Sequence, residues 1–183
     1  MARIPPATRE SVPEDQRAAF DEMVNHYERE RGGVPPNSPV SIMINVPEMA
    51  KWEAHLGDYL RFGSTLSRKV QELAILVTSR ELDCQYIWTR HASWGQEAGL
   101  RKDIVDDLRE KRVPIDLDHE ETALVGDGQE LLRTHRVSQD TFAAALAQFG
   151  VRGLTELTNL MVFNGNALAG ELPEGVSGPT LPL

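Results

Sequence analysis

The sequence predicts an all-α fold, a single-domain helical bundle built from antiparallel helix pairs. Apolar residues recur at the three- and four-residue spacing of helices along most of the 183 residues. Sustained apolar and polar alternation is missing, and no hairpin signal indicates a strand. The length is sufficient for one substantial core. We therefore expect a single domain over residues 1–183, with its core at about 14–170 and flexible termini.

The first two predicted helices lie in the N-terminal third of the chain. Pro13 opens the first with an acidic turn, and its apolar residues follow at helical spacing, namely Phe20, Met23, Val24 and Tyr27. The segment RGGVPPNSP (31–39) ends this helix. Pro47 begins the second helix, whose apolar residues include Met49, Trp52 and Leu56.

A strongly apolar helix is predicted from Ser67 to about Leu82. Its apolar residues lie on more than one side, which is typical of a helix buried in the protein interior. Asp83 is predicted to cap the next helix, from Cys84 to Ala98, and Gly99 to end it. Because the break between the two helices is short, we expect them to pack as antiparallel neighbours.

Four further helices complete the prediction. A short helix runs from about Lys102 to Glu110, and Asp118 and Glu121 fit a capping pattern for a helix that reaches Arg136. Ser138 caps a helix that ends at Gly150, and the last helix runs from about Gly153 to Leu168. The remaining segment, GELPEGVSGPTLPL (170–183), is expected to be a Pro/Gly-rich tail.

Composition excludes several classes of function. The formal net charge of −9 argues against nucleic-acid binding, which needs basic surface to neutralise phosphates. No apolar run approaches the length that spans a bilayer, so we expect no membrane partner, and the charged N-terminus does not resemble a secretory signal. A single cysteine excludes an intramolecular disulfide framework and suits a reducing compartment. We expect a cytoplasmic protein.

Three residues form the candidate catalytic constellation. Cys84 and His91 are seven residues apart, so a continuous helix places them on one face. Glu72 lies in the preceding apolar helix, where a carboxylate is costly unless it is protonated or hydrogen-bonded. Across an antiparallel pair, Glu72 can face His91, with Cys84 near the turn.

The stretch from Val34 to Leu100 resembles the carboxymuconolactone decarboxylase family, which includes the alkyl hydroperoxidase D-like proteins. The matching residues are VPPN (34–37), ELAILVTSRELDCQYIWTRH (72–91) and AGL (98–100), and GLTELTNLMVFNGNALAGELPEG (153–175) resembles the closing helix and tail of the family. The resemblance implies an all-α fold of the alkyl hydroperoxidase D-like type, assembly as a dimer, trimer or hexamer, and functional roles for Glu72, Cys84 and His91.

The function implied by this resemblance is a cofactor-independent lyase that acts on a small carboxylate-bearing lactone or another intermediate of aromatic-compound catabolism by proton transfer. The alternative is a thiol redox protein of the peroxidase type that uses Cys84 with an external resolving thiol, and a third interpretation is a helical oligomer that binds a ligand without chemistry. The peroxidase branch has the motif Cys-x-x-Cys-x-x-x-His, and here its second cysteine is replaced by Ile87. A disulfide-forming cycle within one chain is therefore excluded, and the lyase is preferred.

Each candidate residue also has a structural interpretation. Cys84 could be a small buried hydrophobe, although a place in the first turn of a helix is expected to lower its thiol pKa. Glu72 and His91 could simply join the two helices. The candidate substrate-binding residues are Trp88, Arg80, Arg90 and Asn164; alternatively, Trp88 belongs to the core, Arg90 pairs with Glu97, and Asn164 joins helices. No metal-ligand spacing and no nucleotide-binding motif is present, so neither a metal nor a cofactor is expected.

Overall fold

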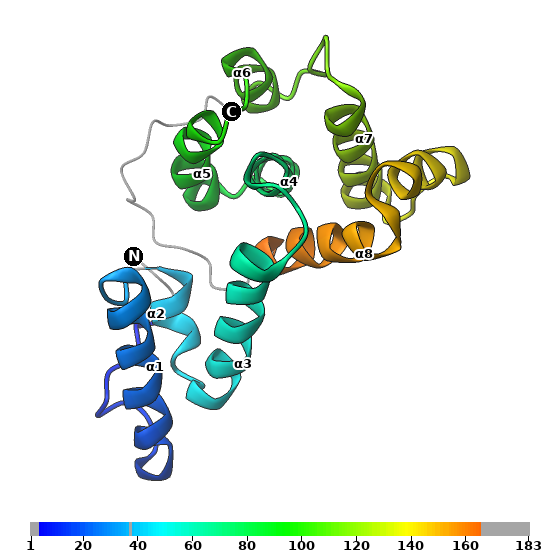
Figure 1. Ribbon diagram of the computed structural model, residues 1–183. Helices are drawn as coiled ribbons and strands as arrows, with labels where there is room; N and C mark the ends of the chain where they lie inside the picture. The colour runs from blue at the N-terminus through cyan, green and yellow to red at the C-terminus, as the bar shows by residue number, and fades with distance from the viewer. Residues whose placement is uncertain (1–3, 37, 166–183) are drawn as a thin grey trace. The chain divides into compact units, whose positions relative to one another are not determined.

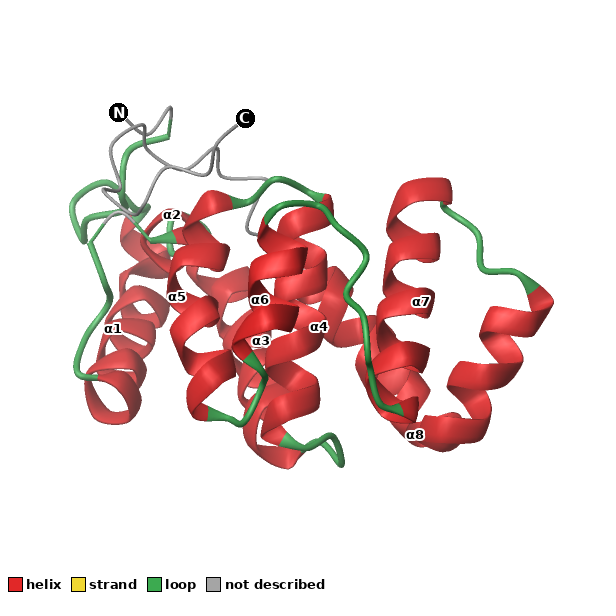
Figure 2. Cartoon of the chain, turned by 90° about the horizontal axis from the view of Figure 1, so that it is seen from above, coloured by secondary structure: helices red, strands yellow, loops and turns green. Residues whose placement is uncertain are grey.

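The computed structural model describes residues 4–36 and 38–165, and these residues group into two compact units. Unit 1 comprises residues 4–62 and unit 2 comprises residues 63–165. Both units are helical, and no strand occurs among the described residues (Figure 2). The all-α prediction is therefore confirmed, whereas a single domain over residues 1–183 stays a prediction.

Unit 1 is built around the packing of two helices, α1 (Arg17–Arg31) against α3 (Pro47–Asp58). A 3-10 turn, η1 (Glu14–Gln16), precedes α1, and a π-helical turn, η2 (Tyr59–Gly63), follows α3. The core of the unit consists of Met23, Tyr27, Ile44, Ala50 and Ala54. The sequence did not predict α2 (Pro39–Met43), whose capping box joins Ser38 and Ser41.

Unit 2 surrounds one central helix, α4 (Arg68–Glu81), which Figure 1 shows end-on. It packs against α5 (Gln85–Glu97), α6 (Lys102–Arg109), α7 (His119–Thr134) and α8 (Gln139–Gly165). Every residue of α4 from Val70 to Arg80 is buried, as the apolar pattern on several sides predicted. The side chain of Ser67 caps α4 by accepting a hydrogen bond from the N–H of Val70 at 3.2 Å.

Most of the predicted helix ends of unit 2 are confirmed. Asp118 and Glu121 form a reciprocal capping box at α7, and Ser138 Oγ accepts from the N–H of Thr141. Gly99 has a positive φ of 98° just beyond α5. Gly150 interrupts the helical conformation inside α8 with φ 66° and ψ 176°, at the residue where one helix was predicted to end.

The predicted cap at Asp83 is wrong. Asp83 adopts a left-handed φ of 52° in the turn between α4 and α5, and the N-cap of α5 is Cys84, without a side-chain hydrogen bond. The carboxylate of Asp83 instead forms ion pairs with Arg80 and Lys111, at 3.3 and 3.0 Å. A left-handed residue lacks the extended backbone of an N-cap, so the carboxylate of Asp83 pairs with these two cations instead.

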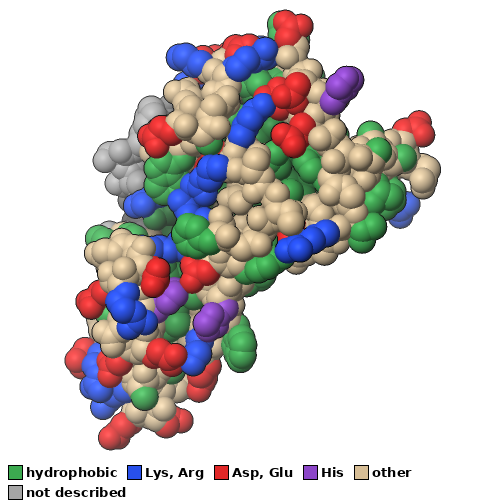
Figure 3. Space-filling model, in the orientation of Figure 1, with side chains coloured by type: hydrophobic (Ala, Val, Ile, Leu, Met, Phe, Trp, Pro, Cys, Tyr) green, Lys and Arg blue, Asp and Glu red, His purple; other side chains and the backbone are tan. Residues whose placement is uncertain are grey.

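Charges of both signs are interspersed on the visible face of unit 2, as Figure 3 shows. Within residues 4–36 and 38–165, no helix is both long and apolar enough to cross a membrane. The predicted end of the last helix at Leu168 and the Pro/Gly-rich segment 170–183 lie outside the described residues.

Candidate active site

The site is centred on Glu72, in the middle of the buried helix α4. Its side chain has no exposed surface, and its helical neighbours Leu73, Ala74 and Leu76 are almost completely buried. An ionised carboxylate at such a position requires partners for both oxygens, because water does not reach it. The structure provides one partner from α5 and one from the first turn of α4.

The partner from α5 is His91. Its Nδ1 lies 2.7 Å from Oε2 of Glu72, a short hydrogen bond between two buried side chains. Residues 72 and 91 meet because α4 and α5 pack against each other after the tight turn at Leu82 and Asp83. The predicted contact between Glu72 and His91 is present, whereas their catalytic role stays a prediction.

The partner from α4 itself is Arg68, a residue that sequence reasoning missed. Its guanidinium forms an ion pair through Nη2 with Oε1 of Glu72, four residues along the same helix. The i,i+4 spacing of Arg68 and Glu72 is the signal that could have found it. Glu72 thus lies between a guanidinium and an imidazole, with one carboxylate oxygen directed to each.

Gln71 holds Arg68 from a second side. Its Oε1 accepts a hydrogen bond from Arg68 Nη1 at 3.4 Å. Its Nε2 donates to Ser64 Oγ at 3.2 Å and to the carbonyl of Leu66 at 3.0 Å. The loop that precedes α4 therefore orients Gln71, and Gln71 helps to orient the guanidinium.

The surroundings of His91 are aromatic. The ring of Trp94 lies edge-on to the imidazole, with centroids 5.0 Å apart. Trp88, a predicted substrate-binding residue, is 2% exposed on the buried side of α5, together with Ile87 and Gly95. This burial agrees with the alternative interpretation, in which Trp88 belongs to the core.

Cys84 shares the buried face of α5 but lies at its beginning. It is the N-cap residue, and its backbone N–H donates to the carbonyl of Ser79 at 2.7 Å. Within the described residues, no hydrogen bond joins its thiol to Glu72 or His91. Burial raises the pKa of the Cys84 thiol, and the backbone N–H groups of Ile87 and Tyr86 only partly offset this effect.

The expectation of a lowered thiol pKa at Cys84 is therefore wrong. The start of a helix does favour the thiolate, as we argued from the sequence. However, the residue is 5% exposed, and desolvation of the anion outweighs the two backbone donors. A thiol in this environment is less nucleophilic at neutral pH than a free cysteine.

The other candidate substrate-binding residues make different contacts. Arg80 is buried and forms its ion pair with Asp83, and Arg90 is exposed with its guanidinium 5.2 Å from the centroid of the Tyr86 ring. Asn164 Nδ2 donates to the carbonyl of Leu160 in its own helix at 2.8 Å. Binding of substrate by these residues stays a prediction, and Arg68 is the arginine that touches Glu72.

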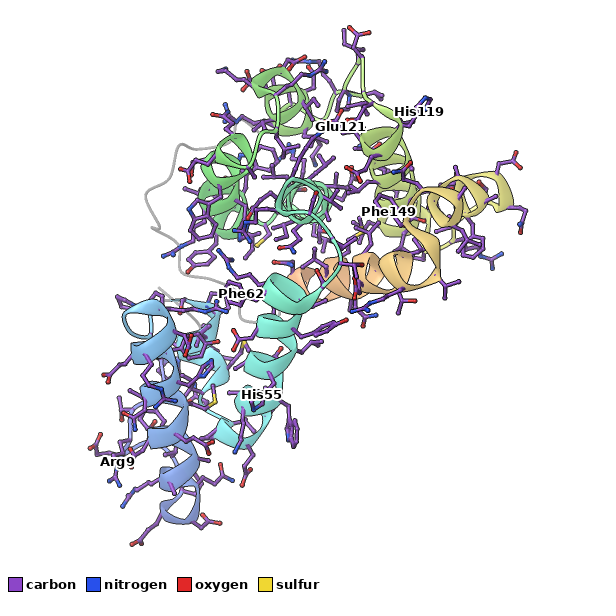
Figure 4. The ribbon with its side chains drawn as sticks, viewed as in Figure 1. Arg9, His55, Phe62, His119, Glu121 and Phe149 are labelled. Carbon is purple, nitrogen blue, oxygen red and sulfur yellow. The ribbon has the colours of Figure 1, made fainter. Side chains whose placement is uncertain are left out.

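The described cavities do not include Glu72, Cys84 or His91. One cavity, of about 580 Å³, lies between α7 and the first part of α8, and its lining includes His119 and Asp140 (Figure 4, where His119 marks the start of α7). A second, of about 420 Å³, lies beside the start of α7. Glu72 and His91 are buried titratable groups in direct contact outside these cavities, and their role in catalysis stays a prediction. Among the residues that the structure describes, no cluster of three or more His, Cys, Asp or Glu could hold a metal ion.

Comparisons with known proteins bear on the family resemblance and on the fold. A model of the carboxymuconolactone decarboxylase family matches residues 47–126, a range that contains Arg68, Glu72, Cys84 and His91. No curated protein matches the sequence.

Two solved structures of the debrominase Bmp8 share the fold. One is a cysteine-to-alanine variant in complex with 2,3,4-tribromopyrrole, with a TM-score of 0.70 and 12% identity over 96% of this chain and 93% of that chain. The other is the apo form, with a TM-score of 0.70 and 12% identity over 95% and 92% of the two chains. The resemblance deduced from the motif is thus confirmed: the chain has the all-α, alkyl hydroperoxidase D-like fold, and residues 47–126 match the carboxymuconolactone decarboxylase family.

Proposed function

We propose that this protein is a cofactor-independent lyase of the carboxymuconolactone decarboxylase type, which decarboxylates a small carboxylate-bearing lactone or related ring acid. The observation that supports it most is the buried hydrogen bond of 2.7 Å between Glu72 and His91. The family match over residues 47–126 supports the same class of chemistry.

His91 is arranged as a proton-transfer group. Because Glu72 accepts from Nδ1, the second ring nitrogen, Nε2, is the one left for a substrate. In the neutral ring, Nε2 accepts a proton; in the imidazolium, it donates one, and the carboxylate of Glu72 stabilises that charge. A histidine fixed by a carboxylate at one nitrogen is suited to general acid and base catalysis at the other.

The proposed reaction needs no cofactor because the substrate itself accepts the electron pair. The C–C bond to the departing carboxylate breaks, CO₂ leaves, and the electron pair moves into the conjugated lactone carbonyl as an enolate. His91 donates the Nε2 proton to the enolate oxygen or to carbon, and water restores the proton afterwards. This reaction requires no chemistry at the thiol of Cys84.

A thiol redox reaction of the peroxidase type is the alternative, and it has less support. Ile87 occupies the position of a resolving cysteine, and Cys84 is the only cysteine in the chain. Burial raises the thiol pKa of Cys84, which disfavours the nucleophilic thiolate.

One pair of assays on the purified full chain tests the proposal. Carbon dioxide release from carboxymuconolactone and consumption of hydrogen peroxide with a dithiol reductant are measured side by side. We expect decarboxylation that depends on His91, and slow peroxide consumption. Fast peroxide turnover that disappears in Cys84→Ser, without any decarboxylation, would replace the lyase by the redox alternative.

We also propose that the enzyme acts as a cytoplasmic homo-oligomer. Apolar side chains at Met49, Trp52 and Leu56 remain exposed along α3 of unit 1, and such a surface favours association. Light scattering at micromolar concentration is expected to give a mass above that of one 20.4 kDa chain. A monomer would refute this part of the proposal.

A further inference from the structure

We propose that Arg68 binds a carboxylate of the substrate, and that this carboxylate is the one that the product retains. The inference rests on the proposed function for the identity of the reaction. The binding itself rests on the contacts of Arg68, which the structure describes independently of any reaction.

Arg68, Glu72 and His91 contact one another in that order, and a comparison of their exposed fractions indicates that a ligand meets Arg68 first. The side chain of Arg68 is 37% exposed, that of His91 is 10% exposed, and Glu72 is fully buried. An anion that arrives from solvent therefore meets the guanidinium before it reaches the histidine. Since the protein carries a formal net charge of −9, a small anion needs a local cation of this kind to bind.

Arg68 retains donors for such an anion. Its contacts with Glu72 and Gln71 engage Nη2 and Nη1, and within residues 4–36 and 38–165 none engages Nε. A guanidinium has five N–H donors in a planar fork that suits a carboxylate. Because Gln71 and Glu72 hold the fork from two sides, little side-chain entropy remains to be lost on binding.

The contacts also limit where the ligand's reactive part lies. Arg68 touches Glu72, and Glu72 touches His91, so the guanidinium and Nε2 of His91 lie within roughly 10 Å of each other, as a chain of direct contacts requires. A small acid bound by Arg68 can therefore extend to His91.

The role of Arg68 follows from the chemistry of carboxylate loss. A cation on the departing carboxylate stabilises the ground state, because the negative charge leaves that group in the transition state. A cation on a second carboxylate binds both states equally and orients the reacting carbon. Under the proposed reaction, Arg68 therefore holds the carboxylate that stays in the product.

The test measures anion binding without turnover. Maleate, a small dicarboxylate, is titrated into the full-length protein, and the ring signals of His91 are followed by NMR, with its dimethyl ester as the neutral control. The signals of His91 are assigned by their loss in His91→Gln. We expect maleate, and not the ester, to shift the His91 signals, and Arg68→Gln to weaken maleate binding by about 10- to 100-fold. Arg68→Lys retains the charge without the fork and should restore part of the affinity.

Arg133 provides the matched control. It is an exposed arginine of α7 whose Nε and Nη2 donate to the carboxylate of Glu81, in the last turn of α4, at 2.7 and 2.6 Å. Arg133→Gln therefore removes an arginine–glutamate pair roughly two turns of α4 beyond Glu72, and maleate binding should be unchanged. The inference would be overturned if Arg68→Gln and Arg68→Lys bound maleate as tightly as the native protein, or if Arg133→Gln lost as much affinity as Arg68→Gln.

The outcome is separable from that of the proposed function. Maleate binding that depends on Arg68, together with absence of decarboxylation, would support the anion site and refute the proposed lyase function. Decarboxylation with an unchanged KM in Arg68→Lys and Arg68→Gln would support the proposed lyase function and refute the anion site. If both proposals hold, the loss in Arg68→Gln should be larger in KM than in kcat.

Discussion

Removal of either member of the Glu72–His91 pair should abolish most of the activity. The variants are Glu72→Gln, which keeps the shape of the side chain, and His91→Ala, which removes the ring. The hydrogen bond between them is 2.7 Å long and joins two buried side chains, so the loss of either partner removes an interaction that the packed interior made specific. General acid–base catalysis contributes roughly 10²–10⁴-fold in rate, and we expect each single variant to lose activity on that scale.

The double variant distinguishes a coupled pair from two independent groups. If Glu72 acts only through His91, its effect disappears once the ring is gone, so Glu72→Gln combined with His91→Ala should lose little more than His91→Ala alone. Losses that multiply would mean that the two residues act separately. Initial rates for all four proteins, each divided by the folded fraction of the same preparation, give the comparison.

Stability must be measured on the same preparations because both groups are buried. Glu72→Gln keeps a hydrogen-bonding side chain opposite His91, and Arg68 can turn toward solvent, so we expect a cost of about 1–3 kcal/mol. For a chain of this size, each kcal/mol lowers Tm by roughly 2–4 °C. Glu121→Gln is the matched control, since Glu121 is a buried carboxylate paired with Lys69 at 2.7 Å on a different helix. Glu72→Gln and His91→Ala with full turnover per folded molecule would refute the proposed site.

Three further variants test neighbouring features. Cys84→Ser should keep most of the decarboxylation rate, and Cys84 in the native protein should react with iodoacetamide at pH 8 more slowly than in urea, as followed by mass spectrometry, because burial raises its pKa. Asp127→Asn should stabilise the protein at pH 7. Burial, together with Glu130, raises the pKa of Asp127, so the stability it contributes is fully present below the unfolded-state value of about 3.9 and is lost as the pH rises through the folded-state value. Urea unfolding should show that Asp127→Asn has a higher free energy of unfolding than the native protein at pH 7, and that this difference disappears near pH 4. An equal difference at both pH values would contradict the prediction. Gly95→Ala should cost about 1–3 kcal/mol, because the new Cβ would lie 2.9 Å from Leu100 Cδ1 and 3.2 Å from Leu76 Cδ1, whereas Gly126→Ala, with its nearest atom at 4.0 Å, should be tolerated.

The sequence predicts the contact between Glu72 and His91 because three local features agree. The apolar pattern around Glu72 requires a buried helix, the break near Leu82 requires a tight turn, and the spacing of Cys84, Trp88 and His91 requires one helix face. Two helices joined in this way have few alternatives to antiparallel packing, so a polar residue on each inner side finds the other. Agreement among local signals is what makes this part predictable.

Features that depend on a balance of forces were not predictable in the same way. The thiol pKa of Cys84 results from desolvation against two backbone donors, and the depth of burial is known only after packing. Asp83 failed as a cap because its backbone is left-handed, with φ 52°, in a turn that makes Cys84 the N-cap of α5, and a turn of this kind is fixed by packing rather than by local sequence. Helix α2 (Pro39–Met43) is too short for periodicity to reveal it.

Stability alone does not account for the Arg68–Glu72–His91 arrangement. A buried ion pair generally contributes no more stability than well-packed apolar residues of similar volume, because desolvation offsets the attraction between the charges. Helix α4 has apolar residues at position 70 and from 73 to 77, so an apolar pair at residues 72 and 91 would suit the fold. Instead, the contacts run from the partly exposed side chain of Arg68 through the fully buried carboxylate of Glu72 to the buried imidazole of His91. Such a path connects solvent with the interior of unit 2. Transfer of a proton and binding of an anion both require this connection, whereas the packing of α4 against α5 does not.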